Sequence, residues 1–246
     1  MKRISFFLIG SLLFCDTKIV PFAVFKNYEK KSFIKSSKLS GFLYSNKNFE
    51  FSFSKTAGEF KEKFGKFYQN DYTLLLKNKN MKYGIHFIDI KNYENEMILI
   101  AEISKNLQTN KIATQFFYTF SKNRYIFQFS PYFENYEFIK DNILNYFRFF
   151  IDFIKYKDNF LAAGFKNTIF YKKFYFSFEF EGGELIEYIK DNGHSVYNTQ
   201  DRVKKIFTLS FGYKNLNLSF KKKYFKEYLG FNTSNRIFSI SYTKKF

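Results

Sequence analysis

The chain of 246 residues has few of the residues that interrupt strands and helices, form disulfides or bind metals: it has two Pro, two His and one Cys. It also has no Trp. A single cysteine excludes a disulfide framework within the chain, so burial or a membrane must stabilise it. So few histidines and cysteines leave no cluster with the spacing of a metal site, and no cofactor is expected. No run of about 18 apolar residues occurs, which excludes a transmembrane helix.

Aromatic and basic residues are in excess instead. The sequence contains 39 Phe and 20 Tyr, which is far too many for a disordered chain and favours strands. The formal net charge is +18. Because the lysines are spread along the whole chain and no nucleic-acid motif is visible, we expect no nucleic-acid partner.

The first residues have the pattern of an export signal. Lys2 and Arg3 precede the apolar stretch 4–14, which is too short to span a bilayer as a helix. Cleavage near Ala23 would divide the chain into a signal peptide (1–23), a periplasmic lead-in (24–36) and a folded domain (37–246). Two alternatives stay open: lipidation of Cys15 in the sequence LLFC, and an uncleaved anchor.

The rest of the chain alternates with a period of two. Residues 170–181 place Phe174, Phe176 and Phe178 on one face, and Ser177 and Glu179 on the other. Successive side chains of a strand point to opposite faces, so this segment predicts a strand with one apolar and one polar side. Similar segments recur almost to the last residue and number between 10 and 14.

Residues 142–156 fit two structures. As a strand, the segment would place Arg148 and Asp152 inward and Phe149 outward; as a helix, Arg148 and Asp152 would pair at i,i+4. We favour the strand, because the neighbouring segments are strands and aromatic and β-branched residues dominate here.

Three features together resemble bacterial outer-membrane β-barrel proteins: the export signal, the many alternating segments, and the final segment Arg236–Phe246, which ends in an aromatic residue. The resemblance implies an all-β fold, a closed antiparallel transmembrane barrel of about 12 strands in the outer membrane, surrounded by its lipid. It also implies that Phe246 is an assembly signal for the barrel-assembly machinery. Alternation does not say which face is inside, so a soluble periplasmic β-sandwich or lipocalin-like barrel stays open.

The barrel interpretation assigns each face a role. The apolar faces would contact lipid, at Phe174, Phe176, Phe178, Phe207, Leu209, Phe211, Leu218, Phe238 and Ile240. The polar faces would line a wet interior, at Lys173, Ser177, Glu179, Lys204, Thr208, Ser210, Lys214, Ser219 and Lys221. An excess of lysine in such an interior would favour anions.

Two functional classes follow from this interpretation. The first is a narrow passive channel for small polar solutes, anions among them. The second is a non-conducting surface barrel, an adhesin or structural protein, whose loops bind a partner. Its ligand site would be the longest polar interruption, 182–202. The tight turns at Lys166-Asn167 and Lys214-Asn215 are typical of the periplasmic side, and 182–202 lies between them on the opposite side, which would be extracellular.

No enzymatic activity is expected. His86 lies in a strand with Asp89 on the opposite face, which favours a structural role. His194 lies in the segment 182–202 near Asp191 and Asp201, an arrangement that faintly resembles the rim of outer-membrane proteases. No motif joins a nucleophile to a base, so we assign no catalytic residue.

Overall fold

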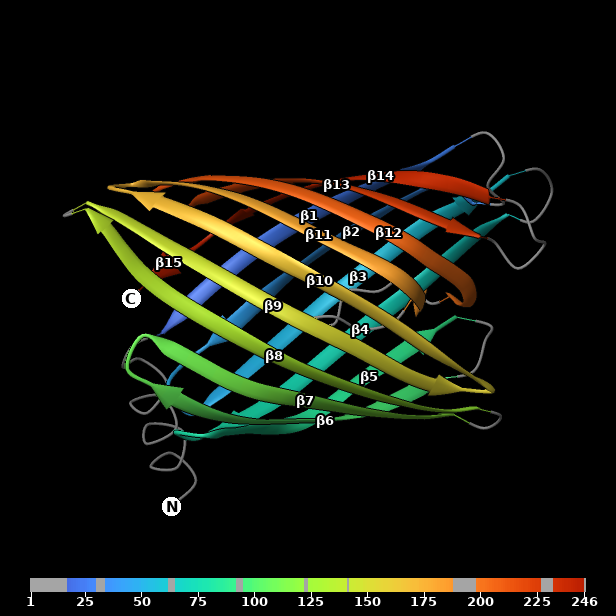
Figure 1. Cartoon of the computed structure of the whole chain (residues 1–246). Coiled ribbons are helices and arrows are strands. Elements are labelled where there is room, and N and C mark those ends of the chain that lie inside the picture. Colours follow the sequence, from blue (N-terminus) through green and yellow to red (C-terminus); the bar gives the residue numbers. More distant parts are fainter. Residues whose placement is uncertain are drawn as a thin grey trace, which may run out of the picture.

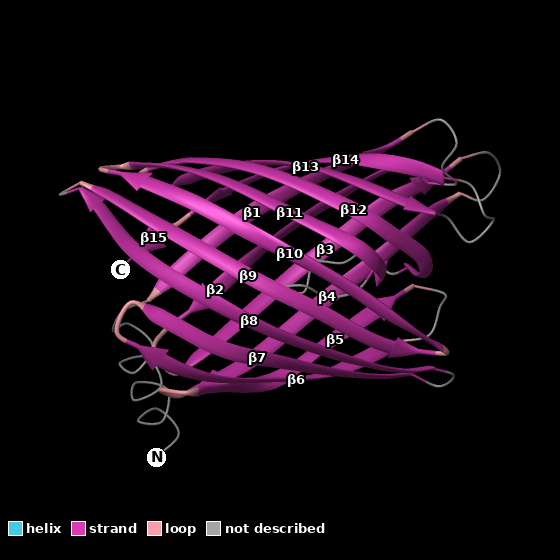
Figure 2. Ribbon diagram, in the orientation of Figure 1, coloured by secondary structure: helices cyan, strands magenta, loops and turns pink. Residues whose placement is uncertain are grey.

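The computed structural model describes residues 17–29, 34–61, 65–91, 95–121, 124–140, 142–187, 198–226 and 232–245, and every regular element in these ranges is a β-strand (Figure 2). The strands are β1 (Lys18–Tyr28), β2 (Ile34–Ser45), β3 (Phe49–Phe60), β4 (Lys66–Lys77), β5 (Met81–Ile90), β6 (Glu96–Leu107), β7 (Asn110–Ser121) and β8 (Arg124–Lys140). They continue with β9 (Ile143–Tyr156), β10 (Asp158–Tyr171), β11 (Phe174–Glu187), β12 (Asn198–Tyr213), β13 (Leu216–Lys226), β14 (Asn232–Tyr242) and β15 (Lys244–Lys245).

These strands form one closed sheet. Each strand pairs with the next along the chain, and β1 pairs antiparallel with β14 from Phe22↔Ser241 to Tyr28↔Asn235. The short β15 continues β14 and pairs with the start of β1. The result is an antiparallel barrel of 14 strands with a steep tilt (Figure 1). Closure leaves no sheet edge with unpaired N–H and C=O groups, which a strand in lipid requires.

The closed all-β barrel confirms the predicted fold class, but the expected count of about 12 strands was wrong. The strand β1 lies at Lys18–Tyr28, inside the residues assigned to the signal peptide and the lead-in. It was overlooked because its residues follow the apolar start of the chain directly. Cleavage after Ala23 would remove six residues of β1 that pair with β2.

The segment with two predicted structures is the strand β9. Asp152 is buried on its inward face and Phe149 is exposed on its outward face, as the strand interpretation required. A single closed sheet with its large apolar side chains outside also differs from a sandwich or a soluble lipocalin-like barrel, in which those side chains would fill the interior.

Connections between strands differ at the two ends of the barrel. One end, here called the turn end, has tight turns whose residues Gln108, Lys172 and Lys214 adopt positive φ; at the opposite end, Lys157 does so in the tight connection from β9 to β10. The predicted turn at Lys166-Asn167 was wrong: β10 runs through both residues to Tyr171. Asn167 lies within the strand, and its Nδ2 donates a hydrogen bond to Asn145 Oδ1 on β9 at 2.9 Å.

The opposite end, here called the loop end, holds the connection between β11 and β12. β11 ends at Glu187 and β12 begins at Asn198. Residues 182–187 and 198–202 of the expected loop 182–202 are therefore strand. The remaining connection, 188–197, lies outside the described residues, together with His194. Phe246 also lies outside them.

The outer face of the barrel carries an apolar belt. All nine residues assigned to lipid lie on this face, and Phe176, for example, is 53% exposed. Rings from neighbouring strands contact one another in the belt, as Phe174 and Tyr213 do at 4.6 Å between centroids. So much exposed aromatic surface suits a hydrocarbon environment and would be costly in water.

Inward-facing glycines make room for aromatic rings. A Cβ at Gly212 would lie 1.8 Å from the Tyr175 ring, and one at Gly164 would lie 2.5 Å from the Phe150 ring. Each ring therefore lies over a bare stretch of backbone on the next strand, where it fills the space left by the missing side chain.

The barrel interior as candidate functional site

Alternate residues of every long strand face the interior, and the charges there balance. Eight of these inward-facing residues that are buried or half-buried are acidic: Glu50, Asp71, Glu96, Glu102, Glu134, Asp152, Glu179 and Glu181. Eight are basic: Lys26, Lys77, Lys82, Lys111, Arg148, Lys166, Lys221 and Lys223. Eight minus eight gives zero, so the described interior lacks the expected lysine excess. The chain's charge of +18 must come from outward-facing, turn, terminal and undescribed residues.

One wall of the interior carries a continuous polar network on β6 to β9. Glu102 accepts hydrogen bonds from Lys111 Nζ at 3.0 Å and from Gln115 Nε2 at 2.7 Å. Lys111 Nζ also donates to the Tyr132 hydroxyl at 2.7 Å. Each of these polar groups is therefore held by a partner on the next strand, which fixes its position in the wall.

The network continues around Arg148. Its guanidinium lies 4.1 Å from the centroid of the Tyr132 ring, and its Nε lies 4.0 Å from a Glu134 oxygen. Glu134 in turn accepts a hydrogen bond from the Tyr146 hydroxyl at 2.9 Å. Positive and negative groups alternate from strand to strand, so this wall presents both signs within a few residues.

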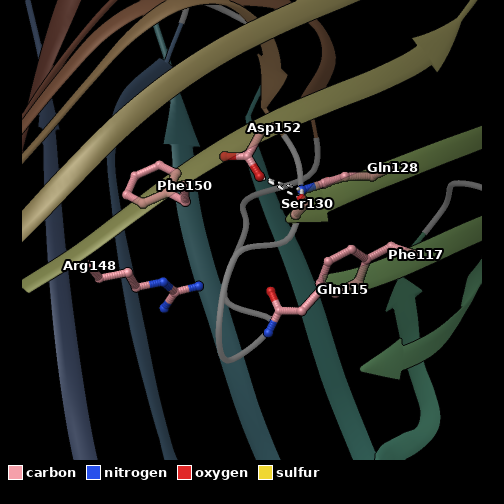
Figure 3. Close-up of a pocket in the computed structure, with 7 residues that line it drawn as sticks. All are labelled: Gln115, Phe117, Gln128, Ser130, Arg148, Phe150 and Asp152. Carbon is pink, nitrogen blue, oxygen red and sulfur yellow. Dashed lines mark hydrogen bonds between the residues drawn. The ribbon is translucent and has the colours of Figure 1, made fainter. Parts of the chain in front are cut away.

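A small pocket opens next to the network, lined by Gln115, Phe117, Gln128, Ser130, Arg148, Phe150 and Asp152 (Figure 3). Ser130 Oγ donates to Asp152 Oδ1 at 2.5 Å, and Gln128 Nε2 lies 3.3 Å from the same oxygen. Arg148 and Gln115 point toward the same space from β9 and β7 (Figure 3). The pocket therefore combines a guanidinium, amides and a carboxylate around a space of about one water molecule.

The wall formed by β3 to β5 holds His86. The ring is fully buried, its Nδ1 lies 2.6 Å from Thr73 Oγ1, and its Nε2 lies 3.4 Å from Asp71 Oδ1. Asp89 lies on the outer face, where Asn70 donates to it. Within the described ranges, no group of three side chains could hold a metal ion.

Six of the nine residues assigned to the interior face inward and form two adjacent rows. Glu179 pairs with Thr208 and Thr208 with Lys221; Ser177 pairs with Ser210 and Ser210 with Ser219. The other three do not face inward from a strand. Lys173 and Lys214 lie in turns, and Lys204 is exposed at the loop end beside a β-bulge between Val203 and Lys205.

Most of the polar network was not found from the sequence. On β6, the inward face carries Glu96, Ile98, Ile100 and Glu102, so apolar and charged residues share it and the alternation is blurred. Alternation places the residues of one strand on faces, but nothing in one strand shows which residue of the next it meets. The spacing of Arg148 and Asp152 on one face was the available signal.

Apolar side chains line the interior near the loop end. This apolar collar consists of Ile88, Ile90, Ile98 and Phe117 on β5 to β7, and of Ile126, Ile154, Phe160, Ala162, Leu185, Val203, Ile206 and Phe225 on β8 to β13. All of them are buried, so the interior has an apolar zone near the loop end and a charged zone nearer mid-height.

The outer rim at the loop end carries a compensated cluster. Lys204 Nζ lies 2.7 Å from Glu184 Oε1, and Arg202 lies 3.6 Å from Glu184 and 3.3 Å from Asp158. The hydrogen bond from Lys204 lowers the pKa of Glu184 below its ordinary value. Two acids and two bases therefore neutralise one another beyond the apolar belt.

No helix in the described ranges is long and apolar enough to cross a membrane. No protein-family model matches the chain, and no curated protein matches it. Among solved structures, a bacterial polysaccharide outer membrane secretin matches with a TM-score of 0.51 and 9% identity, over 93% of this chain and 98% of that one. The chain has the fold of bacterial outer-membrane β-barrel proteins.

Two further solved structures have lower scores. OccD3 (OpdP) of Pseudomonas aeruginosa matches with a TM-score of 0.45 and 7% identity, over 94% of this chain and 91% of that one. OmpT, an outer membrane protein of Vibrio cholerae, matches with a TM-score of 0.38 and 9% identity, over 93% and 97%. At such identities the likeness concerns the fold, and the interior must be interpreted from its own residues.

Proposed function

We propose that this protein is a narrow passive channel of the bacterial outer membrane for small polar solutes. The observation that carries the proposal is the interior itself: sixteen buried or half-buried charges and many hydroxyl and amide groups face inward from a closed barrel. A barrel of 14 strands is intermediate between small filled barrels and open porins of 16 to 18 strands, which supports a narrow passage.

The arrangement of charge favours polar and zwitterionic solutes over simple anions. Lys221 and Lys223 face inward from β13, and seven strands away around the barrel Glu96 and Glu102 face inward from β6. Both signs are present around the interior, and a net charge of zero excludes neither ion.

The second functional class, a surface barrel that binds a partner, loses its main argument. It rested on the length of the polar interruption 182–202, and residues 182–187 and 198–202 are strand. No feature of the described residues favours it over a channel.

Single-channel recording in planar bilayers tests the proposal. We expect discrete conductance steps and a reversal potential near zero in a KCl gradient. A protein that folds but never conducts would refute the channel, and strong anion selectivity would refute the balanced interior.

Neutralising two luminal lysines should then make the channel prefer cations. An ion passing about 7 Å from one ammonium gains or loses about 0.6 kcal/mol in water, and screening at 0.1 M salt halves this to about 0.3 kcal/mol. Two lysines act on the cation and, with opposite sign, on the anion, so their removal changes the difference between the two ions by about 1.2 kcal/mol. K221Q/K223Q should therefore raise the ratio of cation to anion permeability by about sevenfold. Lys222, which lies between them but faces outward, is the matched control: K222Q should leave the ratio unchanged.

A further inference from the structure

A second group of basic residues lies on the outer face near the loop end. This basic patch consists of Lys222 on β13, Arg236 on β14, Lys38 on β2 and Lys55 on β3. Lys222 is half-buried and the other three are exposed. The patch contributes four of the positive charges that lie outside the balanced interior.

Two members of the patch stand directly opposite one another. Lys222 and Arg236 are cross-strand partners in the register of β13 and β14, and both face outward. Like charges directly opposite on neighbouring strands repel and destabilise the pair. An anion bound between them would reverse the sign of that interaction.

Acidic side chains do not compensate the patch. None of the four basic side chains forms an ion pair in the described part of the chain, and outward-facing positions of β13, β14, β1 and β2 carry no Asp or Glu there. On β3, Glu59 faces outward, but its carboxylate lies 3.3 Å from Lys35 Nζ. Glu29 follows β1, and the hydrogen bond that its carboxylate accepts from Ser234 leaves its negative charge in place, so four basic side chains outnumber one nearby acid. By contrast, the cluster of Arg202, Lys204, Glu184 and Asp158 at the same end is neutralised internally, so the excess charge is confined to one side of the rim.

The patch begins where the apolar belt ends. One step toward the turn end, Phe220 pairs with Phe238, and Phe238 pairs with Phe25. Tyr224 lies one step in the other direction, with Lys222 Nζ 4.7 Å from its ring centroid. A molecule bound here would therefore place apolar chains over phenylalanine rings and an anionic group over the basic side chains.

We propose that the basic patch binds the phosphate of an anionic membrane lipid, whose acyl chains lie on the belt below. Phosphate supplies the negative charge that would offset the repulsion between Lys222 and Arg236, and a guanidinium can bind phosphate through two hydrogen bonds. The proposal rests on the placement of the barrel in a membrane, but it does not depend on whether the barrel conducts.

Lipid binding to the purified, full-length barrel in detergent tests this site. Native mass spectrometry would count bound phosphatidylglycerol as its mole fraction in the micelle rises, with phosphatidylcholine as the neutral probe. Each positive charge near a membrane surface changes anionic lipid binding by about fivefold. K222Q/R236Q should therefore weaken phosphatidylglycerol binding at least tenfold, while phosphatidylcholine binding stays the same.

The matched control is R202Q/K204Q, which removes two positive charges from the same end but from the neutralised cluster. It should change phosphatidylglycerol binding less than twofold. Equal losses in both variants would overturn the proposal, because they would show attraction by overall charge. Unchanged binding in K222Q/R236Q would overturn it as well.

Two further measurements keep the test decisive. Inorganic phosphate at about 10 mM should not displace the lipid, since it lacks the acyl chains; complete displacement would show a free-anion site and refute the lipid proposal. Heat-modifiable gel migration checks that each variant folds. If the double variant does not fold, K222Q alone, which removes the like-charge contact, should still weaken binding by about fivefold.

Discussion

Removal of Glu102 should cost the barrel more free energy of unfolding than removal of an exposed acid. In Glu102→Ala, Lys111 keeps only the Tyr132 hydroxyl, and the Gln115 amide loses its acceptor. The side chains of Lys111 and Glu102 are only 24% and 13% exposed, so water replaces the lost carboxylate incompletely. Breaking a fully buried pair costs about 3–5 kcal/mol, and this partly exposed one should cost about 2–3 kcal/mol.

The physical reason can be separated from a simple loss of contacts. In E102L/K111M both charges are gone, no charged group is left without a partner, and the free energy of unfolding should fall by only about 1 kcal/mol. The double variant should thus be more stable than E102A alone. Lys35 and Glu59, 3.3 Å apart but 62% and 45% exposed, provide the control: E59A should cost less than about 0.5 kcal/mol.

Urea unfolding of the barrel in lipid vesicles measures these differences. The chain has no Trp, so far-UV circular dichroism or tyrosine emission must follow the transition. An E102A variant as stable as E59A would refute the argument from burial. A double variant less stable than E102A would show that Lys111 is stabilised by groups other than Glu102.

Three further predictions concern the backbone and the chain start. Gly212→Ala should lower the free energy of unfolding by about 1–3 kcal/mol, because its Cβ would displace the tyrosine ring that lies 1.8 Å away; unchanged urea midpoints would contradict this. Lys172→Asn should raise stability by about 0.5 kcal/mol, since φ at Lys172 is 53° and Asn adopts that region more easily; K173N should bring no gain. The intact mass of the exported protein should place its first residue at or before Lys18, because β1 begins there; a mature chain that starts after Ala23 and still forms the barrel would show that β1 can be half its length.

The faces of the strands could be predicted because a period of two assigns each residue to a side. Glu179, Thr208 and Lys221 had been assigned to one face, and register brings them into one row. Phe149 and Asp152 on β9 were separated by the same rule. Alternation is thus sufficient for the chemistry of each face, and the neighbours on the next strand follow only from the register.

Strand ends could not be predicted in the same way. Alternation continues until the chain turns, so it does not mark the last residue of a strand. Lys172 adopts positive φ in the turn Lys172-Lys173, without the glycine or asparagine that usually marks a two-residue turn, whereas the predicted turn Lys214-Asn215 contains asparagine. Lys166-Asn167 looked like a turn because two polar residues interrupt an apolar run, yet Lys166 faces inward and Asn167 bonds to Asn145.

Net charge misled the prediction for the interior, because composition does not say which face a lysine occupies. Lys221, Lys222 and Lys223 are adjacent in the chain, but the first and third face the interior and the second faces outward. Inside, a lysine without a nearby acid would be costly in a half-buried wall, so acids accompany the bases there. Outside, beyond the apolar belt, water and lipid headgroups can solvate a lysine without an acid. The positive excess therefore accumulates where solvation costs least, and it bears on the membrane surface more than on the choice of solute.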